Sequence, residues 1–165
     1  SSTIKNLKNV RVYAKFISNG SFSNCFAFFC LNSSFLFCKH AIPEMEKDGG
    51  GSIILVASQL GRVARPGRPW YCGAKGGLIN MARAIALDHA KQGIRCNALS
   101  PGPIETDRYV SNFDNVEHAR ENNFTLFERL GLPEEISPGA VFLASDESSF
   151  MTGSDLLIDG GFTAV

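Results

Sequence analysis

The sequence has no excess of charge of either sign and no long apolar run. Its 165 residues include sixteen lysines and arginines and sixteen aspartates and glutamates. A balanced chain offers no basic surface of the kind that attracts nucleic acid or an anionic membrane. An apolar run of about 18 residues, which a membrane-spanning helix requires, does not occur. We therefore expect one soluble globular domain that binds neither nucleic acid nor a membrane.

The cysteines also show no metal-binding pattern. There are five, with no CxxC pair and no Cys/His cluster of zinc-site spacing, so we expect no metal. An odd number of scattered cysteines is typical of reduced thiols in a reducing compartment, which favours a cytoplasmic protein. The five are Cys25, Cys30, Cys38, Cys72 and Cys96.

Residues 1–30 differ in character from the rest of the chain. A basic start is followed by an uncharged stretch, 18–38, that is rich in Phe and Ser. This order resembles a signal peptide, but Asn and Ser residues interrupt the apolar part. Partial alternation of apolar and polar residues predicts a strand over 10–17. We assign 1–30 to a separate N-terminal segment and 31–165 to the main domain.

From residue 31 onward, apolar strand patterns alternate with helical ones. Such alternation predicts βαβ units, hence an α/β fold with a parallel sheet between two layers of helices. The run SIILVA is almost wholly apolar, as expected for a strand buried on both faces. The predicted strands are 52–57, 94–99 and 155–158, and the predicted helices are 35–47, 70–91 and 133–143.

Three residues between 58 and 75 can form one proton-transfer site. Tyr71 and Lys75 are four apart in a predicted helix, so they share one of its faces. A lysine ammonium one turn away stabilises a phenolate and lowers its pKa, and a serine hydroxyl can hold a substrate oxygen against the tyrosine. Ser58 ends the preceding strand. The Tyr–Lys spacing alone also arises by chance in long helices, with the tyrosine packed and the lysine solvated.

Five motifs that follow one another along the chain strengthen the prediction of a proton-transfer site. HAIPEM begins at 40, GSIILVAS at 51, YCGAK at 71, IRCNALSPGPIET at 94 and MTGSDLLIDGG at 151. From about residue 31 to 165 the chain resembles the C-terminal part of a short-chain dehydrogenase/reductase, with its Rossmann-like three-layer fold. The branch it most resembles is that of the 3-oxoacyl-(acyl carrier protein) reductases. The resemblance implies that Tyr71 is the general acid/base, that Lys75 lowers its pKa and binds the nicotinamide ribose, and that Ser58 positions the substrate oxygen.

The resemblance also implies a cofactor, a substrate class and an oligomer. Members interconvert secondary alcohols and ketones with NAD or NADP, and nothing in this sequence decides between the two cofactors. Helices 35–47 and 70–91 resemble the faces that pair subunits into homodimers and tetramers. The residues expected at the nicotinamide end, besides Tyr71 and Lys75, are Pro101, Gly102, Ile104 and Thr106.

Two features depart from the family pattern. No TGxxxGxG turn, whose glycines let the backbone approach a pyrophosphate, occurs in the sequence. Cys30 stands where the family has a fourth catalytic residue, an asparagine, and Asn32 is about 200° around the helix from it.

We interpret the chain as an N-terminally truncated Rossmann-like domain, and two functions follow. The first is an NAD(P)-dependent oxidoreductase acting on a small alcohol or ketone. The alternative is an inactive fragment that acts, if at all, by associating with other subunits.

Overall fold

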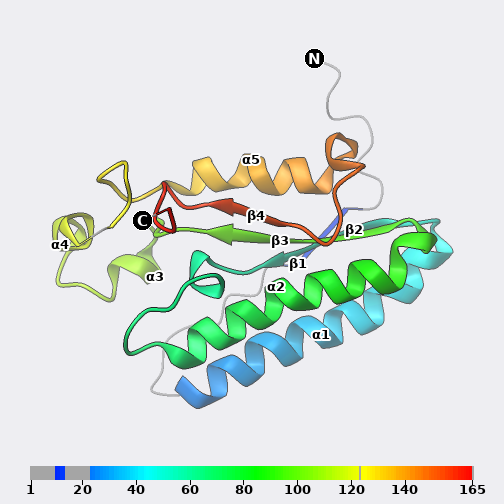
Figure 1. Ribbon diagram of the computed structural model, residues 1–165, viewed down its shortest axis with the longest axis horizontal. Helices are drawn as coiled ribbons and strands as arrows, with labels where there is room; N and C mark the ends of the chain where they lie inside the picture. The colour runs from blue at the N-terminus through cyan, green and yellow to red at the C-terminus, as the bar shows by residue number, and fades with distance from the viewer. Residues whose placement is uncertain (1–9, 14–22, 123, 165) are drawn as a thin grey trace.

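One parallel sheet between two layers of helices forms the described part of the protein (Figure 1). The computed structural model describes residues 10–13, 23–122 and 124–164. In these ranges the strand order follows the chain: β1 (Val10–Tyr13), β2 (Gly51–Val56), β3 (Ile94–Pro101) and β4 (Asp155–Ile158). Helices α1 (Ser23–Lys47) and α2 (Pro69–His89) cover one face, and α5 (Pro133–Ala144) covers the other. The predicted α/β/α layering is confirmed.

The two central strands are apolar because both of their faces are covered. Ile53 of β2 pairs with Cys96 of β3, and both pack into the cluster beneath α1 and α2. Ile54 is the next residue along β2 and points to the opposite face, where it packs with Leu99 and with Leu143 of α5. All five side chains are buried, so the sheet separates two cores.

Strand β1 covers the outer edge of β2. The predicted strand ran over 10–17, and the observed one is Val10–Tyr13, paired parallel to β2 with Val10 opposite Ser52. Residues 14–17 of the predicted strand lie outside the described residues. Without this pairing β2 would expose an apolar edge, which favours aggregation.

Helix α1 begins twelve residues earlier than predicted. It starts at Ser23 and not at residue 35, and Pro43 lies within it. The earlier turns pack on α2: a Cβ atom built on Gly77 would lie 2.8 Å from Leu31 Cδ2, so the small residue permits the close approach. The proposed boundary between residues 30 and 31 falls inside this helix, and the division into two segments stays a prediction. In the described part of the chain, no helix combines the length and apolar character needed to cross a bilayer.

The remaining elements lie close to their predicted bounds. Helix α2 is followed by a short 3₁₀ turn, Ala90–Gln92, which ends at Gly93, whose φ of +76° is the left-handed conformation that glycine favours. Strand β3 runs two residues further than predicted, to Pro101. Between β3 and α5, the chain forms the short helices α3 (Asp107–Val110) and α4 (Val116–Glu121). Helix α5 begins at Pro133, as its proline and acidic first turn predict.

Candidate active site

The candidate residues gather at one edge of the sheet because its strands are parallel. Ser58 follows the end of β2, and Gly102 follows the end of β3. The carboxyl ends of parallel strands lie at the same edge, which is where open α/β sheets bind their ligands. Helix α2 begins near this edge and carries Tyr71 and Lys75 in its first two turns.

Ser58 is held in an extended conformation at the start of a 3₁₀ turn, Gln59–Gly61. Its φ is −173°, and its Oγ accepts a hydrogen bond of 3.3 Å from the amide of Leu60. The same hydroxyl donates to Oε1 of Gln59 over 2.6 Å. Both Ser58 and Gln59 are buried. The serine hydroxyl therefore has a defined position between the amide of Leu60 and the side chain of Gln59.

Tyr71 and Lys75 lie beside this serine. The Tyr71 side chain hydrogen-bonds that of Ser58, and Nζ of Lys75 lies 5.7 Å from the centroid of the Tyr71 ring. Nζ also donates a 2.8 Å hydrogen bond to the main-chain oxygen of Val56, the last residue of β2. The structure thus brings all three predicted residues together.

Gly61 permits the serine turn to lie directly on α2. A Cβ atom at this position would be 2.8 Å from the carbonyl carbon of Lys75 and 2.7 Å from Cδ1 of Ile79. Real Cβ atoms do not approach other atoms so closely. A glycine is therefore required where the turn that carries Ser58 crosses the helix that carries its two partners.

Burial shifts the pKa values of the tyrosine and the lysine in opposite directions. It raises the pKa of the Tyr71 phenol, while the hydrogen bond with Ser58 and the charge of Arg108 act in the opposite sense. Burial also lowers the pKa of Lys75, and Arg108 adds to this effect. Tyr71 is therefore neutral near pH 7. The expected lowering of its pKa by Lys75 stays a prediction.

Cys30 lies close enough to influence both groups. If this half-buried residue of α1 were a thiolate, its charge would raise the pKa of Tyr71 and that of Lys75. Asn32 is exposed on the same helix, as its position about 200° further around predicts. A thiol therefore approaches the Tyr–Lys pair at the place where the resemblance implies an asparagine.

Of the residues predicted for the nicotinamide end, Pro101 is the last residue of β3, and Gly102, Ile104 and Thr106 lie in the loop that follows it. The amide of Gly102 donates to the oxygen of Ile158 over 2.9 Å, and a Cβ atom on Gly102 would lie 2.5 Å from Cα of Asp159. Ile104 lies in a small cavity between this loop and α5. Thr106 caps α3 by accepting from the amide of Tyr109. Arg108 belongs to that helix, and its charge acts on the pKa values of Tyr71 and Lys75, so the loop after β3 comes near this pair.

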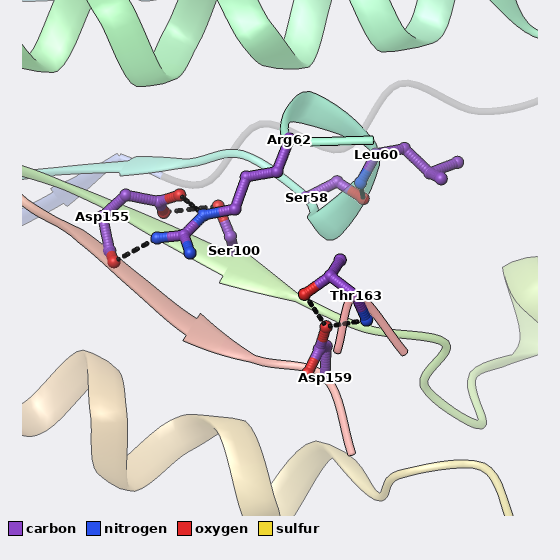
Figure 2. Close-up of polar contacts among 7 residues, drawn as sticks. All are labelled: Ser58, Leu60, Arg62, Ser100, Asp155, Asp159 and Thr163. Atoms are coloured by element: carbon purple, nitrogen blue, oxygen red, sulfur yellow. Dashed lines mark hydrogen bonds and ion pairs between the residues drawn. The ribbon is translucent and has the colours of Figure 1, made fainter. Parts of the chain in front are cut away.

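The sequence did not predict a set of polar contacts between the turn that carries Ser58 and strands β3 and β4 (Figure 2). Arg62 leaves the serine turn and pairs with Asp155 at the start of β4, where Ser100 also donates to the Asp155 carboxylate. Arg62 and Asp155 are 93 positions apart. The burial of Asp155 at the start of β4 indicates that it needs a positively charged partner. A single sequence does not show which acidic residues are buried.

Comparison with known proteins places this chain among oxidoreductases. A family model described as enoyl-(acyl carrier protein) reductase matches residues 17–163. An uncharacterized oxidoreductase of Bacillus subtilis is 45% identical over 141 residues, which are 81% of this chain and 51% of that protein. A 3-oxoacyl-(acyl carrier protein) reductase of Chlamydia trachomatis is 39% identical over 131 residues, which are 79% of this chain and 52% of that protein.

A solved structure shows the same fold. It is that of a 4-hydroxyisoleucine dehydrogenase mutant complexed with NADH and succinate, with a TM-score of 0.83 and 28% identity. The match covers 93% of this chain and 68% of that one. The chain spans about half the length of the curated relatives it matches.

Proposed function

Because this chain belongs to the short-chain dehydrogenase/reductase family, we propose that it interconverts a small secondary alcohol and the corresponding ketone. The observation that carries the proposal is the contact set at α2: a tyrosine hydrogen-bonded to Ser58, with the Lys75 ammonium over its ring. A phenol, a hydroxyl and an ammonium grouped at one edge of the sheet can bind a substrate oxygen and transfer a proton to it. The relatives' names support an oxidoreductase and favour it over an inactive fragment.

Ser58 is proposed to position the substrate oxygen. Its hydroxyl hydrogen is directed at Oε1 of Gln59, 2.6 Å away. To donate to a carbonyl oxygen, Ser58 must exchange this acceptor for the substrate. The amide of Leu60 keeps its bond to Oγ during the exchange. The serine therefore moves only its hydrogen, and its oxygen remains beside Tyr71.

Tyr71 is proposed to give or take the proton. Because burial raises its pKa, the phenol is protonated at neutral pH, which is the form that protonates an alkoxide when a ketone is reduced. Alcohol oxidation requires the phenolate, which the Lys75 ammonium stabilises. The main-chain oxygen of Val56 holds that ammonium in place.

The cofactor is proposed to be NAD or NADP, bound along the same edge. Lysine, tyrosine and threonine side chains are the donors and acceptors that ribose hydroxyls and a carboxamide need, so the residues fit the nicotinamide end. A nicotinamide held there would supply the hydride chemistry of the reaction. No glycine-rich phosphate-binding turn occurs among the 165 residues. The residues proposed to contact the cofactor are Tyr71, Lys75, Pro101, Gly102, Ile104 and Thr106.

Association into homodimers or tetramers through α1 and α2 is proposed as well. Phe35 and Leu36 of α1 are 55% and 43% exposed, and Leu87 of α2 is 84% exposed. Large apolar side chains along two adjacent helices favour burial against another copy of the chain. The Chlamydia trachomatis relative is named for a 3-oxoacyl substrate, and we propose a 3-oxo compound as one substrate class for this chain.

Cofactor binding by the purified 165-residue chain tests the proposal. NADPH or NADH should bind with a saturable signal below millimolar concentration and turn over with ethyl acetoacetate, a 3-oxo ester. Tyr71→Phe removes one hydroxyl and should abolish turnover while sparing binding. Lys47→Met is the control, since Lys47 is exposed and forms an ion pair with neighbouring Glu44, away from the candidate residues. No saturable binding would contradict the proposal for this chain, and unchanged turnover in Tyr71→Phe would refute the assigned role.

A further inference from the structure

A buried carboxylate lies behind the serine turn. The Asp155 side chain is 2% exposed, and both of its oxygens accept hydrogen bonds. Oδ1 accepts from Ser100 Oγ over 2.5 Å, and Oδ2 accepts from Arg62 Nε over 2.6 Å. Figure 2 shows the three side chains converging from a loop and two strands. A buried carboxylate is costly unless it is paired, so these contacts are a condition for burying Asp155.

Arg62 binds Asp155 by its side chain at two points. Besides the Nε contact, Nη2 donates to the main-chain oxygen of Asp155 over 2.9 Å. The guanidinium is planar and rigid, so two bonds fix the direction in which the arginine leaves its backbone. Asp155 is in turn fixed, because its strand pairs with β3 in register, with Ala98 opposite Asp155.

The Arg62 backbone continues directly from the turn that carries Ser58. The Arg62 amide donates to the oxygen of Gln59 over 2.9 Å, and the Gly61 amide donates to the oxygen of Ser58 over 2.8 Å. The turn thus rests on α2 at Gly61 on one side and is bound to β4 through Arg62 on the other. A displacement of Arg62 would therefore be transmitted to Ser58 through the hydrogen-bonded backbone of residues 58–62.

We propose that Arg62 and Asp155 are positioning residues that hold the turn presenting Ser58 to the substrate oxygen. In the described part of the chain, neither residue hydrogen-bonds or forms an ion pair with Tyr71 or Lys75, so their effect passes through Ser58. This role deepens the proposed function and rests on it for its catalytic consequence. The attachment of the turn to β4 is a property of the fold, and it can be measured without a substrate.

Amide hydrogen exchange of the full chain tests the holding of the turn. In Arg62→Met and in Asp155→Asn, the amides of residues 60–63 should exchange faster than in the unmodified chain, because the turn loses its attachment to β4. Arg129→Met is the matched control: it removes another two-bond arginine–carboxylate pair, with Glu135, and should leave residues 60–63 unchanged. Unchanged exchange in both test variants would overturn the proposal.

Turnover of ethyl acetoacetate with NADPH tests the consequence. Arg62→Met should lower kcat roughly tenfold, since small displacements of a positioning group cost rates of this order, and should leave NADPH affinity unchanged. If the effect passes through Ser58, Arg62→Met should have almost no further effect on kcat in a Ser58→Ala chain. Equal losses in both backgrounds would refute the route through Ser58. If the unmodified chain shows no turnover, the proposed function fails, and the exchange rates alone decide whether Arg62 and Asp155 hold the turn.

Discussion

The Lys75 ammonium donates a 2.8 Å hydrogen bond to the main-chain oxygen of Val56, which joins α2 to the end of β2. Lys75 thus contributes to the relative position of the two elements that carry Tyr71 and Ser58. The same bond directs the charge, since Nζ stays 5.7 Å from the Tyr71 ring centroid. Lys75 thus has a structural role, through its bond to Val56, and a proposed chemical role, which is to stabilise the Tyr71 phenolate. Measurements of stability and of turnover separate the two roles.

Lys75→Met should remove turnover without a large loss of stability. The variant leaves the Val56 oxygen without its donor, which costs about 1–3 kcal/mol. It also removes an ammonium whose burial is unfavourable, as the lowered pKa of Lys75 shows. These effects oppose each other, so the free energy of unfolding in urea should change by less than about 1–2 kcal/mol. Turnover retained at the original level would contradict the role given to Lys75.

The two directions of the reaction should depend on pH in opposite ways. Reduction needs the Tyr71 phenol, and burial raises the pKa of Tyr71 above its ordinary value of 10.0. Reduction should therefore keep its kcat from neutral pH up to strongly alkaline pH and then fall. Oxidation needs the phenolate, so its kcat should rise with pH over the same range. Profiles of kcat in both directions provide the test, and an oxidation rate independent of pH would exclude Tyr71 as the base.

Gly61→Ala should disturb the site, whereas Gly73→Ala should not. The new methyl group at position 61 would lie 2.8 Å from the Lys75 backbone, and at position 73 it would meet nothing within 4 Å. We expect a loss of about 1–3 kcal/mol for Gly61→Ala, the usual cost of overpacking. Gly73→Ala lies in a helix and should gain roughly 0.5–1 kcal/mol. Urea midpoints and kcat measure both, and equal behaviour of the two variants would show that the turn can move away from α2 freely.

The Arg129–Glu135 pair should stabilise the protein at neutral pH and lose its effect in acid. Hydrogen bonds from Arg129 and from the Leu132 amide lower the pKa of Glu135 to about 2, from an ordinary value of 4.5. Because the folded-state pKa is the lower one, the contribution is complete above pH 4.5 and is lost as the pH falls towards 2. The stability difference between the unmodified chain and Glu135→Gln should shrink over this window. The urea midpoints of both chains, measured against pH, give that difference. A constant difference would show that Glu135 is not titrating there.

Strand and helix positions were predictable where local patterns determine them. Ile53 and Ile54 lie in an apolar run that only a strand covered on both faces accommodates, and β2 lies within a residue of its predicted bounds. Gly93 and Pro133 mark helix ends by their own backbone preferences. The first half of α1 was missed, because its Asn and Ser residues interrupt the pattern. Its helix is supported by contact with α2, such as that of Leu31 with Gly77.

The candidate site was predictable to the same extent. The spacing of Tyr71 and Lys75 placed them on one helix face, and Ser58 was expected at the end of a strand. The contact between Arg62 and Asp155 was not predictable, because the sequence does not show which residues 93 positions apart meet. Contacts within a turn or helix follow from spacing, whereas contacts across the sheet depend on the strand order.

The strand order has a consequence for how the chain folds. Each strand pairs with the one that precedes it in the sequence, so the sheet can grow by one strand at a time during synthesis. The turn after β2 can form early, but Arg62 finds Asp155 only when β4, the final strand in this order, has docked. The turn that carries Ser58 therefore gains its attachment to β4 only after residue 155 has been made, and a nascent chain that ends before that residue carries the three candidate residues without this contact.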